Sequence, residues 1–559
     1  MNVVLEKQKK QIKERNALKN NDKLCPNCAN ELNSIGVCNK CNYHSKISYK
    51  ERIDLLCDNG TFKELYKDMI TNYSEQFDYK AKYDKSTLES GLKEAVVSGK
   101  CKMNNHNVVI CIMEYSFMAG TLGISNGEKI TKTIEYATKN KLPLIILCAS
   151  GGARIQEGVA ALVQMAKIVS ALEKHKQKGL LYISCLLNPT LGGVTASFGL
   201  MGDINITEPN TTIGFAGKKV IKETINEDNN DYFQSELFNQ EYGMIDIVCE
   251  RKDLKNTITN ILNILTIKNN FKIESRNVEF DYSKHNKVDI LNKNRDITTN
   301  KCKDYIIKMF DEFYELHGDR ISYDDSSIIS GIGIINGLKV AIAAQNKGRN
   351  LNENIDCHYG MTSPEGYRKA TRIAELAEKF ELPLVLLIDS PGAYPSLKAE
   401  QNGQALSIST CMVKLLNTKT IILTYVIGEA CSGGALSLSI SDYIAMFSKS
   451  MYCVISPEAY IRIISKDMKI NEKLLQDMKY SALDLYSNNL IDDVLKEKEL
   501  EFNIEQIKNS ILNKVNELSK INMKELLNNR YEKIRNWDSS VRGNKWKKHL
   551  YLQGKEMSI

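Results

Sequence analysis

Apolar runs alternate with helical stretches along most of the chain. Runs rich in leucine and β-branched residues, such as Leu144–Leu147 and Ile421–Ile427, lead into glycine-containing turns, and stretches with helical periodicity follow, for example Glu157–Leu172. Continuous apolar strands that alternate with helices are typical of a parallel sheet covered on both faces. The pattern therefore predicts an α/β fold.

The pattern also repeats within the chain. Three pairs of segments correspond at offsets of 240, 241 and 239 residues: Leu142–Arg154 with Leu382–Tyr394, Leu191–Val194 with Ser432–Ala435, and Asp203 with Asp442. Agreement of three separate anchors within two residues indicates an internal duplication. We therefore expect two copies of one fold.

Composition divides the chain further. We expect a charged N-terminal tail over residues 1–23, a cysteine-rich module over 24–49, a globular domain over 50–265, and a linker rich in Asn and Lys over 266–300. A second globular domain should span 301–500, and a charged helical tail 501–559.

Composition and charge narrow the class of protein. Of the 559 residues 43% are hydrophobic and 26% charged, which excludes collagen-like and largely disordered chains. The net charge is +7, and residues 1–23 carry four of these charges, a balance that suits phosphate-bearing small molecules without requiring nucleic acid. No apolar run approaches the ~18 residues of a membrane span, and the polar N-terminus lacks a secretory apolar segment. We expect a soluble, cytoplasmic protein.

Four of the fifteen cysteines form two CxxC knuckles. Cys25 and Cys28 make the first, and Cys38 and Cys41 follow after a gap of nine residues. Two knuckles can present four thiolates to one tetrahedral Zn²⁺, and such a site has no open position for catalysis. We therefore predict a structural zinc ribbon rather than a pair of redox motifs. A ribbon of this kind can also contact nucleic acid.

Adjacent glycines follow an apolar strand in each half. Gly192 and Gly193 precede one helical stretch, and Gly433 and Gly434 precede another. Paired glycines at the start of a helix expose backbone N–H groups with no Cβ in the way, and such donors can stabilise an oxyanion. Close helix–strand packing explains a single glycine pair equally well. Recurrence in both halves favours the oxyanion interpretation.

Other candidate sites are weaker. The turn Ser150–Arg154 could bind a phosphate, or Arg154 could instead pair with Glu157. The chain has no GxGxxG or GxxxxGK[ST] motif, and no serine has a histidine at a spacing typical of a hydrolase. Oxyanion donors without an obvious protein base point to a substrate that supplies its own base.

Longer motifs resemble one enzyme family. Ser150–Glu157, Asn188–Ser197 and Ile213–Gly217, behind a four-cysteine ribbon, are similar to the β subunit of bacterial acetyl-CoA carboxylase carboxyltransferase. Similarity to the α subunit of that enzyme rests on Phe313–Arg320, Lys347–Arg349, Ser363–Lys369, Asp389–Pro395, Gly428–Ala435 and Ile455–Glu458. Over roughly residues 24–500 the chain therefore resembles both subunits fused in the order β then α.

The resemblance implies a ClpP/crotonase-like fold in both halves and a function in malonyl-CoA synthesis, the first committed step of fatty acid synthesis. It implies transfer of a carboxyl group from carboxybiotin, on a biotin carboxyl carrier protein charged by biotin carboxylase, to acetyl-CoA. Gly192 and Gly193 would stabilise the thioester enolate, and Gly433 and Gly434 the ureido oxygen of biotin, whose own nitrogen would remove the methyl proton.

The resemblance also implies the remaining binding residues and the assembly. Substrate would contact the residues of two strand-end loops and one further glycine: Gly151, Gly152, Ala153, Arg154, Gly217, Gly392, Ala393 and Tyr394. Family subunits pair β with α across a dimer, so the fused chain should be at least a homodimer.

Several residues depart from the family pattern near the expected cleft, among them Ala430-Cys431 in place of two glycines. Two further interpretations therefore stay open. The chain could carboxylate another acyl-CoA, or act as a biotin-dependent decarboxylase. Alternatively, the ribbon and the basic N-terminus could bind nucleic acid on a degenerate crotonase scaffold.

Overall fold

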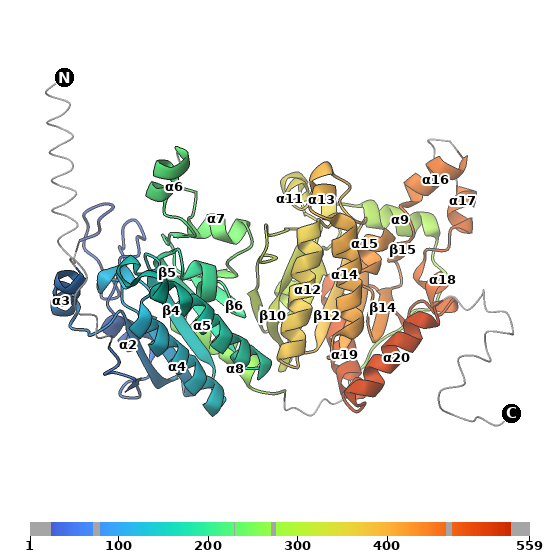
Figure 1. Ribbon diagram of the computed structural model, residues 1–559. Coiled ribbons are helices and arrows are strands. Elements are labelled where there is room, and N and C mark those ends of the chain that lie inside the picture. The colour runs from blue at the N-terminus through green and yellow to red at the C-terminus, as the bar shows by residue number, and fades with distance from the viewer. Residues whose placement is uncertain (1–23, 71–78, 228–229, 270–274, 466–471, 538–559) are drawn as a thin grey trace, which may run out of the picture. The chain divides into compact units, whose positions relative to one another are not determined.

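The computed structural model describes residues 24–70, 79–227, 230–269, 275–465 and 472–537. The chain forms two compact units (Figure 1). The first unit comprises Met1–Lys268 with Leu316–Asp324, and the second comprises Asn269–Glu315 with Asp325–Ile559. The tail predicted over residues 1–23 lies outside the described residues.

The first unit contains one eight-stranded sheet. Its strands are β1 (Lys63–Leu65), β2 (Val96–Met103), β3 (His106–Met113), β4 (Leu144–Ser150), β5 (Tyr182–Leu191), β6 (Ile204–Thr207), β7 (Ile213–Gly214) and β8 (Ile247–Val248). They lie in the order β1-β2-β3-β4-β5-β6-β8, with β7 paired to the end of β5. Strands β1 to β3 are antiparallel, and every pairing from β3 onward is parallel.

The second unit repeats this topology. Its strands are β9 (Glu312–Glu315), β10 (Ile328–Ile335), β11 (Leu338–Gln345), β12 (Leu384–Ser390), β13 (Ile422–Cys431), β14 (Tyr443–Phe447), β15 (Met451–Cys453) and β16 (Asp493–Leu495). The order is β9-β10-β11-β12-β13-β14-β16, with β15 paired to β13. The same order and the same change from antiparallel to parallel pairing confirm the duplication.

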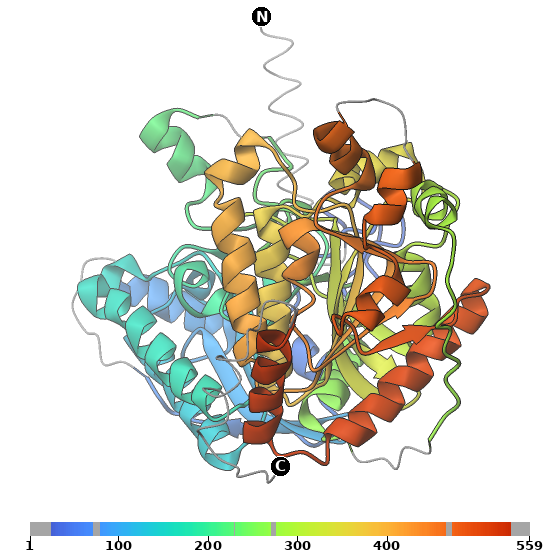
Figure 2. The same ribbon diagram turned by 90° about the vertical axis from the view of Figure 1, so that its right-hand side faces the viewer.

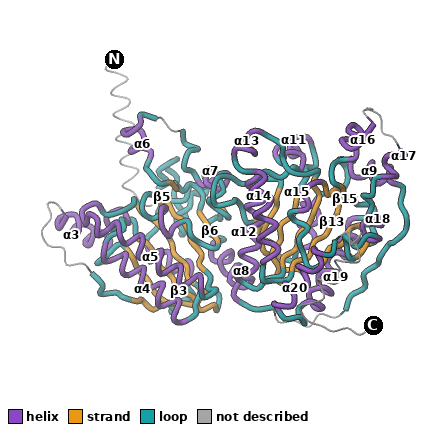
Figure 3. The backbone as a smooth tube through the Cα atoms, turned by 45° about the vertical axis from the view of Figure 1, so that its right-hand side comes forward, coloured by secondary structure: helices purple, strands orange, loops and turns teal. Residues whose placement is uncertain are grey.

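Helices cover both sheets. The first unit has α2 (Tyr49–Leu56), α3 (Tyr79–Ser90), α4 (Ile124–Asn140), α5 (Gly158–Gln177), α6 (Lys218–Ile225), α7 (Glu236–Glu241) and α8 (Leu254–Thr266). Short helical turns span Met118–Gly120, Ile155–Glu157 and Thr195–Gly199. Helices α4 and α5 pack side by side along one face of the sheet (Figures 1 and 3).

The second unit is richer in helices. They are α9 (Lys287–Arg295), α10 (Cys302–Met309), α11 (Leu351–Asp356), α12 (Pro364–Lys379), α13 (Leu397–Gln401), α14 (Gln404–Asn417), α15 (Ser432–Leu436), α16 (Pro457–Ser465), α17 (Glu472–Asp477), α18 (Ala482–Ser487), α19 (Leu500–Leu518) and α20 (Met523–Arg535), with a turn at His358–Gly360. Helices α12 and α14 pair as α4 and α5 do (Figures 1 and 2).

Local sequence explains these elements. All residues of β4 and β12 are buried, as expected for central parallel strands covered on both faces. Helix α12 begins with Pro364 at its first position after Ser363, where a missing N–H costs no helical hydrogen bond. Helix α2 begins with a capping box in which Ser48 and Glu51 exchange hydrogen bonds.

The linker predicted over residues 266–300 is structured where it is described. It contains α9, and Ile290 and Leu291 of this helix are buried in a core cluster of the second unit. Phe280 forms a β-bridge with Leu495. Asn and Lys dominate the composition of this segment, so its few apolar residues, which pack in the core, did not stand out in the sequence. The linker interpretation was therefore wrong for the part of 266–300 that is described.

The predicted C-terminal tail forms helices α19 and α20, which end at Leu518 and Arg535, but it is not a solvated appendage. Ile507 and Ile511 of α19 and Leu526 of α20 belong to the main core cluster of the second unit. Residues 538–559 lie outside the described residues.

Arg530 attaches α20 to the second sheet. It is 1% exposed, and its guanidinium lies 2.7 Å from Asp442 Oδ2. It also donates hydrogen bonds of 2.7–2.8 Å to the carbonyl oxygens of Leu415, Thr418 and Thr420. Its positive charge is paired with Asp442, and its N–H donors have acceptors inside the protein, as the burial of an arginine requires.

Replacing Arg530 with alanine should therefore destabilise the second unit. Arg530→Ala leaves Asp442 buried without its partner, and we expect the free energy of unfolding to fall by about 3–5 kcal/mol in urea titrations. Lys524→Ala, an exposed change on the same helix, should shift it by less than about 0.5 kcal/mol. Equal stability of the two variants would show that Arg530 does not attach the helix.

Candidate active sites and metal centre

The backbone of the two halves corresponds at an offset of 240 residues around the strand ends. Left-handed φ angles recur at Met118 and His358, Ala119 and Tyr359, Gly120 and Gly360, Gly152 and Gly392, and Gly192 and Ser432. Gly193 therefore corresponds to Gly433, and the glycine pairs that the sequence aligned at 241 are displaced by one residue. Chain geometry, rather than glycine identity, gives the true correspondence.

The first candidate site lies where β4 and β5 end side by side. Gly152 follows β4 with φ +117°, and Gly192 follows β5 with φ +61°. A Cβ on Gly192 would lie 3.1 Å from the Gly152 Cα, so glycine allows the two loops to approach closely without a steric conflict.

Two backbone donors of this site have no protein partner. Among the described residues, none accepts a hydrogen bond from the N–H of Ala153 or of Gly193. Both residues are half-buried, and a Cβ placed on Gly193 would lie 3.7 Å from the Ala153 nitrogen. Unpaired N–H groups at a partly enclosed position are donors that a bound oxyanion can use.

Gly151 and Gly217, two further predicted binding residues, lie beside this site. Gly151 is exposed at the start of the loop after β4. The N–H of Gly192 donates to the carbonyl oxygen of Phe215 at 2.8 Å, and Gly217 caps α6 two residues later. The structure therefore brings the predicted glycines of the first half together.

Arg154 does not face this site. Its side chain is fully buried and pairs with Glu94 at 2.5 Å and Glu157 at 3.0 Å, and it donates to the Thr121 carbonyl oxygen. Burial disfavours the charged guanidinium, but Glu94 and Glu157 outweigh it and raise the pKa of Arg154. The prediction that Arg154 binds substrate is therefore wrong, and its alternative pairing with Glu157 is observed.

The second candidate site lies at the ends of β12 and β13. Gly392 follows β12 with φ +131°, and Ser432 follows β13 with φ +65°. No described residue accepts a hydrogen bond from the N–H of Ala393 or of Gly433. The second half thus repeats the pair of free donors seen in the first.

The two glycines of this site differ in their surroundings. Gly433 has no atom within 4 Å of an added Cβ, so it faces open space. A Cβ on Gly434 would lie 2.6 Å from both the Ala393 nitrogen and the Tyr367 hydroxyl oxygen, so no larger residue fits. Gly433 is therefore the donor accessible to a ligand.

A cavity of about 610 Å³ adjoins Gly433. Its lining is largely apolar: Ser432, Gly433, Leu436, Ile444, Tyr452, Cys453, Val454, Tyr460, Asp477, Met478, Lys479, Leu485, Leu490 and Trp537. A mainly apolar cavity of this size, with the backbone donor of Gly433 in its lining, is typical of a site for a small organic ligand.

Tyr394, predicted to bind substrate, carries a partner that the sequence did not indicate. Its ring stacks on His358 with centroids 4.1 Å apart and an interplanar angle of 17°. His358 belongs to the left-handed turn before α12, and Thr362 bridges to Ala393. Contact between these loops depends on chain topology, which spacing along the sequence does not reveal.

Sequence reasoning also missed a buried ion cluster beneath the second site. Lys347 Nζ lies 2.8 Å from Asp389 and 2.9 Å from Glu429, and Arg295 lies 2.7 Å from Glu429. Burial alone would raise the pKa of both carboxyl groups, but Lys347 lowers the pKa of each below its usual value. The cluster fixes the ends of β12 and β13, from which the site loops emerge.

The four predicted metal ligands meet in the first unit. The Sγ atoms of Cys25, Cys28, Cys38 and Cys41 all lie within 4.8 Å of one another, with three separations of 3.4–3.5 Å. Hydrogen bonds from Asn30 lower the pKa of the Cys28 thiol to about 6. Four thiols in this arrangement could hold one tetrahedral metal ion.

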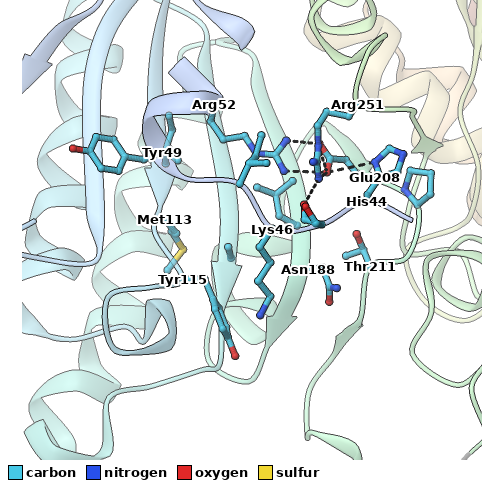
Figure 4. Close-up of a pocket in the computed structure, with 16 residues that line it drawn as sticks. His44, Lys46, Tyr49, Arg52, Met113, Tyr115, Asn188, Glu208, Thr211 and Arg251 are labelled. Atoms are coloured by element: carbon cyan, nitrogen blue, oxygen red, sulfur yellow. Dashed lines mark hydrogen bonds and ion pairs between the residues drawn. The ribbon is translucent and has the colours of Figure 1, made fainter. Parts of the chain in front are cut away.

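Buried charges attach the cysteine module to the first sheet (Figure 4). Glu208 accepts hydrogen bonds from Arg52 and Arg251, and Arg251 also donates to the carbonyl oxygens of Ile35 and Ser45 in the module. His44 Nε2 lies 2.8 Å from Glu250. The module is thus held by a charged cluster in addition to its own cysteines.

Comparisons with known proteins agree with one another. A family model described as acetyl co-enzyme A carboxylase carboxyltransferase-like matches residues 246–538. The acetyl-coenzyme A carboxylase carboxyl transferase subunits beta/alpha of Clostridium tetani are 42% identical over 89% of both chains. The corresponding protein of Natranaerobius thermophilus is 38% identical over 90% of both chains.

Solved structures share the fold. The transcarboxylase 12S crystal structure has a TM-score of 0.70 at 20% identity and covers 85% of this chain and 90% of its own. A single-chain, multi-domain long-chain acyl-CoA carboxylase has a TM-score of 0.64 at 15% identity, covering 84% of this chain and 46% of its own. These likenesses confirm two crotonase-like α/β halves. Sequence and fold together show that the chain belongs to the acetyl-CoA carboxylase carboxyltransferase family, with its β and α parts fused.

Proposed function

We propose that the chain transfers a carboxyl group from carboxybiotin, carried on a biotin carboxyl carrier protein, to acetyl-CoA and so forms malonyl-CoA. The observation that carries this proposal is the recurrence of two free backbone donors at corresponding strand ends in both halves. This reaction develops negative charge on two oxygens, that of the thioester enolate and that of the biotin ureido group. A protein with two donor pairs can stabilise both.

The first site suits the thioester. The N–H groups of Ala153 and Gly193 can bind the carbonyl oxygen and strengthen their hydrogen bonds as enolate charge develops. Loss of one such donor costs about 10²–10³ in turnover in hydrolases with an oxyanion hole. Met165 borders the site, since its sulfur would lie 3.1 Å from a Cβ on Gly193.

The second site suits the biotin ring system. The apolar cavity beside Gly433 can bury a bicyclic ring. The N–H groups of Gly433 and Ala393, which have no acceptor among the described residues, can bind its ureido oxygen. Tyr394, which follows Ala393 and is stacked on His358, helps to hold the loop that carries the Ala393 donor. Biotin supplies the carboxyl group and the nitrogen that accepts the methyl proton, so the protein contributes orientation and charge stabilisation.

The reverse reaction tests the activity directly. Purified protein should convert malonyl-CoA to acetyl-CoA only when a soluble biotin derivative is present, measured by separation of the CoA esters. Parallel assays with methylmalonyl-CoA and longer carboxyacyl-CoAs decide the acyl group, and we expect malonyl-CoA to give the highest kcat/KM. Biotin-independent loss of malonyl-CoA, or faster turnover of another ester, would contradict the proposal.

Gly433→Ala should strongly impair transfer without harming the fold. The added methyl group meets no atom within 4 Å but projects into the space that the ligand needs. We expect kcat/KM to fall by about 10²-fold or more while the unfolding transition stays unchanged.

Gly337→Ala provides the matched control for Gly433→Ala. Gly337 has φ +82° in the β10–β11 turn, so alanine should cost about 1 kcal/mol of stability there and leave transfer intact. The oxyanion assignment fails if Gly433→Ala retains activity.

We also propose that the four cysteines hold structural Zn²⁺. Tetrahedral Zn–S bonds of about 2.3 Å separate the sulfurs by about 3.8 Å, close to the observed 3.4–3.5 Å. All four positions are filled by protein, so the metal would stabilise the ribbon and take no part in the reaction.

Cys38→Ser should remove the metal and loosen the ribbon. We expect about one zinc per chain in the wild type by atomic absorption, well under half that amount in the variant, and faster proteolysis within residues 24–49. Cys148→Ala, which removes a buried thiol of β4, should retain the metal. Full zinc content in Cys38→Ser would contradict the ligand set.

Assembly and location complete the proposal. We propose a homodimer that works with the carrier protein and biotin carboxylase in the cytoplasm. Val159, Leu162 and Val163 on α5 are more than half exposed, an apolar surface suited to burial in a dimer.

The segment Ile155–Gln177 is long and apolar enough to cross a membrane, but a lone helix of this kind is weak support for a span.

A further inference from the structure

Two buried thiols meet in the second unit immediately before Ser432 and Gly433. Cys431 ends β13 and Cys453 ends β15, and the two residues are partners in the register of these parallel strands. Their Sγ atoms lie 2.9 Å apart. A covalent S–S bond is about 2.05 Å long, so the two sulfurs need to approach by less than about 1 Å.

The backbone spacing also suits a covalent link. Adjacent strands lie about 4.8 Å apart, inside the Cα separation of about 4.4–6.8 Å that disulfides adopt. The corresponding pair in the first unit is Leu191 and Gly214, so the first site has no thiols at these positions. The thiol pair therefore distinguishes the second site from the first.

The two thiols differ in their access to solvent and in their chemistry. Cys431 is fully buried, whereas Cys453 is 6% exposed and lines the cavity of about 610 Å³ beside Gly433. The hydrogen bond with Cys453 and burial raise the pKa of Cys431 far above its usual range. Cys453 is therefore the sulfur that an oxidant entering the cavity meets first.

We propose that Cys431 and Cys453 form a reversible disulfide that slows the second site. With hydrogen peroxide as oxidant, the Cys453 sulfur attacks one peroxide oxygen, the O–O bond breaks, and water leaves with the thiol proton. The Cys431 sulfur then displaces hydroxide from the Cys453 sulfenic acid, and its own proton converts that hydroxide to a second water. Two thiols thus supply the two electrons that reduce the peroxide, and a thiol reductant reverses the change.

The link acts on the donor of the second site through the backbone. Cys431 is the N-cap of α15, which carries Gly433, and its thiol donates to Glu429 Oε1 at 3.4 Å. Disulfide formation removes that hydrogen bond and shifts the residue that begins the helix. A misplacement of about 1 Å at a reacting geometry can cost about 10²-fold in rate. This effect on rate rests on the proposed carboxyl transfer, but the cross-link itself does not.

Peroxide titration of the full-length protein tests the proposal. We expect mass mapping of tryptic peptides to find Cys431 joined to Cys453, and biotin-dependent turnover to fall at least fivefold in step with this link. Dithiothreitol should restore both. If peroxide joins neither sulfur to the other, the proposal is overturned, whatever the protein's activity.

Variants separate this pair from the other thiols. Cys453→Ser should lose the peroxide-dependent fall in turnover, measured as the ratio of rates before and after oxidation in the same variant. Cys57→Ser disrupts another adjacent thiol pair, Cys57 with Cys101, and should keep the fall. A fall that persists in Cys453→Ser would assign the effect to other cysteines, and a cross-link without any fall would refute the effect on rate.

Discussion

The geometry of the candidate site in each half depends on two parallel strands that end side by side while their next residues turn apart. In both halves the register shifts near the strand ends, between Cys148 and Ser150 in one half and between Ile388 and Ser390 in the other. Beyond the shift, the loops leave N–H groups that the sheet no longer pairs. A buried sheet normally satisfies such donors, so unpaired ones indicate a site for a ligand.

Unpaired N–H donors can bind a ligand well only if their positions are fixed. The strand ends that carry them are fixed by different surroundings in the two halves. Beneath the second site, Lys347 draws Asp389 and Glu429 together inside the protein. The corresponding positions of the first half are Ala149 and Pro189, which carry no charge. Ion pairing here serves geometry more than stability, since buried charges cost as much to desolvate as they return in attraction.

Much of the fold and part of the site could be predicted from sequence. The hydrophobic runs predicted the α/β class, and the internal repeat predicted two halves. The CxxC spacing predicted a cluster of four cysteines, which the structure brings together: Cys25, Cys28, Cys38 and Cys41. Other features depend on packing that the chain order does not record. Arg154 ends a turn that resembles a phosphate-binding loop. Its side chain is nevertheless buried in an ion pair with Glu94, which lies sixty residues earlier in the chain. Ile290 and Leu291 are two apolar residues in a polar stretch, so they do not form a recognisable hydrophobic pattern in the sequence. In the structure they anchor α9 to a core cluster of the second unit.

The displacement of the glycine pairs by one residue is accompanied by different packing behind the two loops. Val194 occupies the position that corresponds to Gly434, and Gly127 the position that corresponds to Tyr367. Compared with the first half, the second half thus has the smaller residue on the loop and the larger one on the helix behind it. In the second half a valine at position 434 would clash with the Tyr367 hydroxyl, so these two positions form a coupled pair there. A loop that carried the valine of the first half would therefore not fit against α12 of the second, and the two loops are not interchangeable.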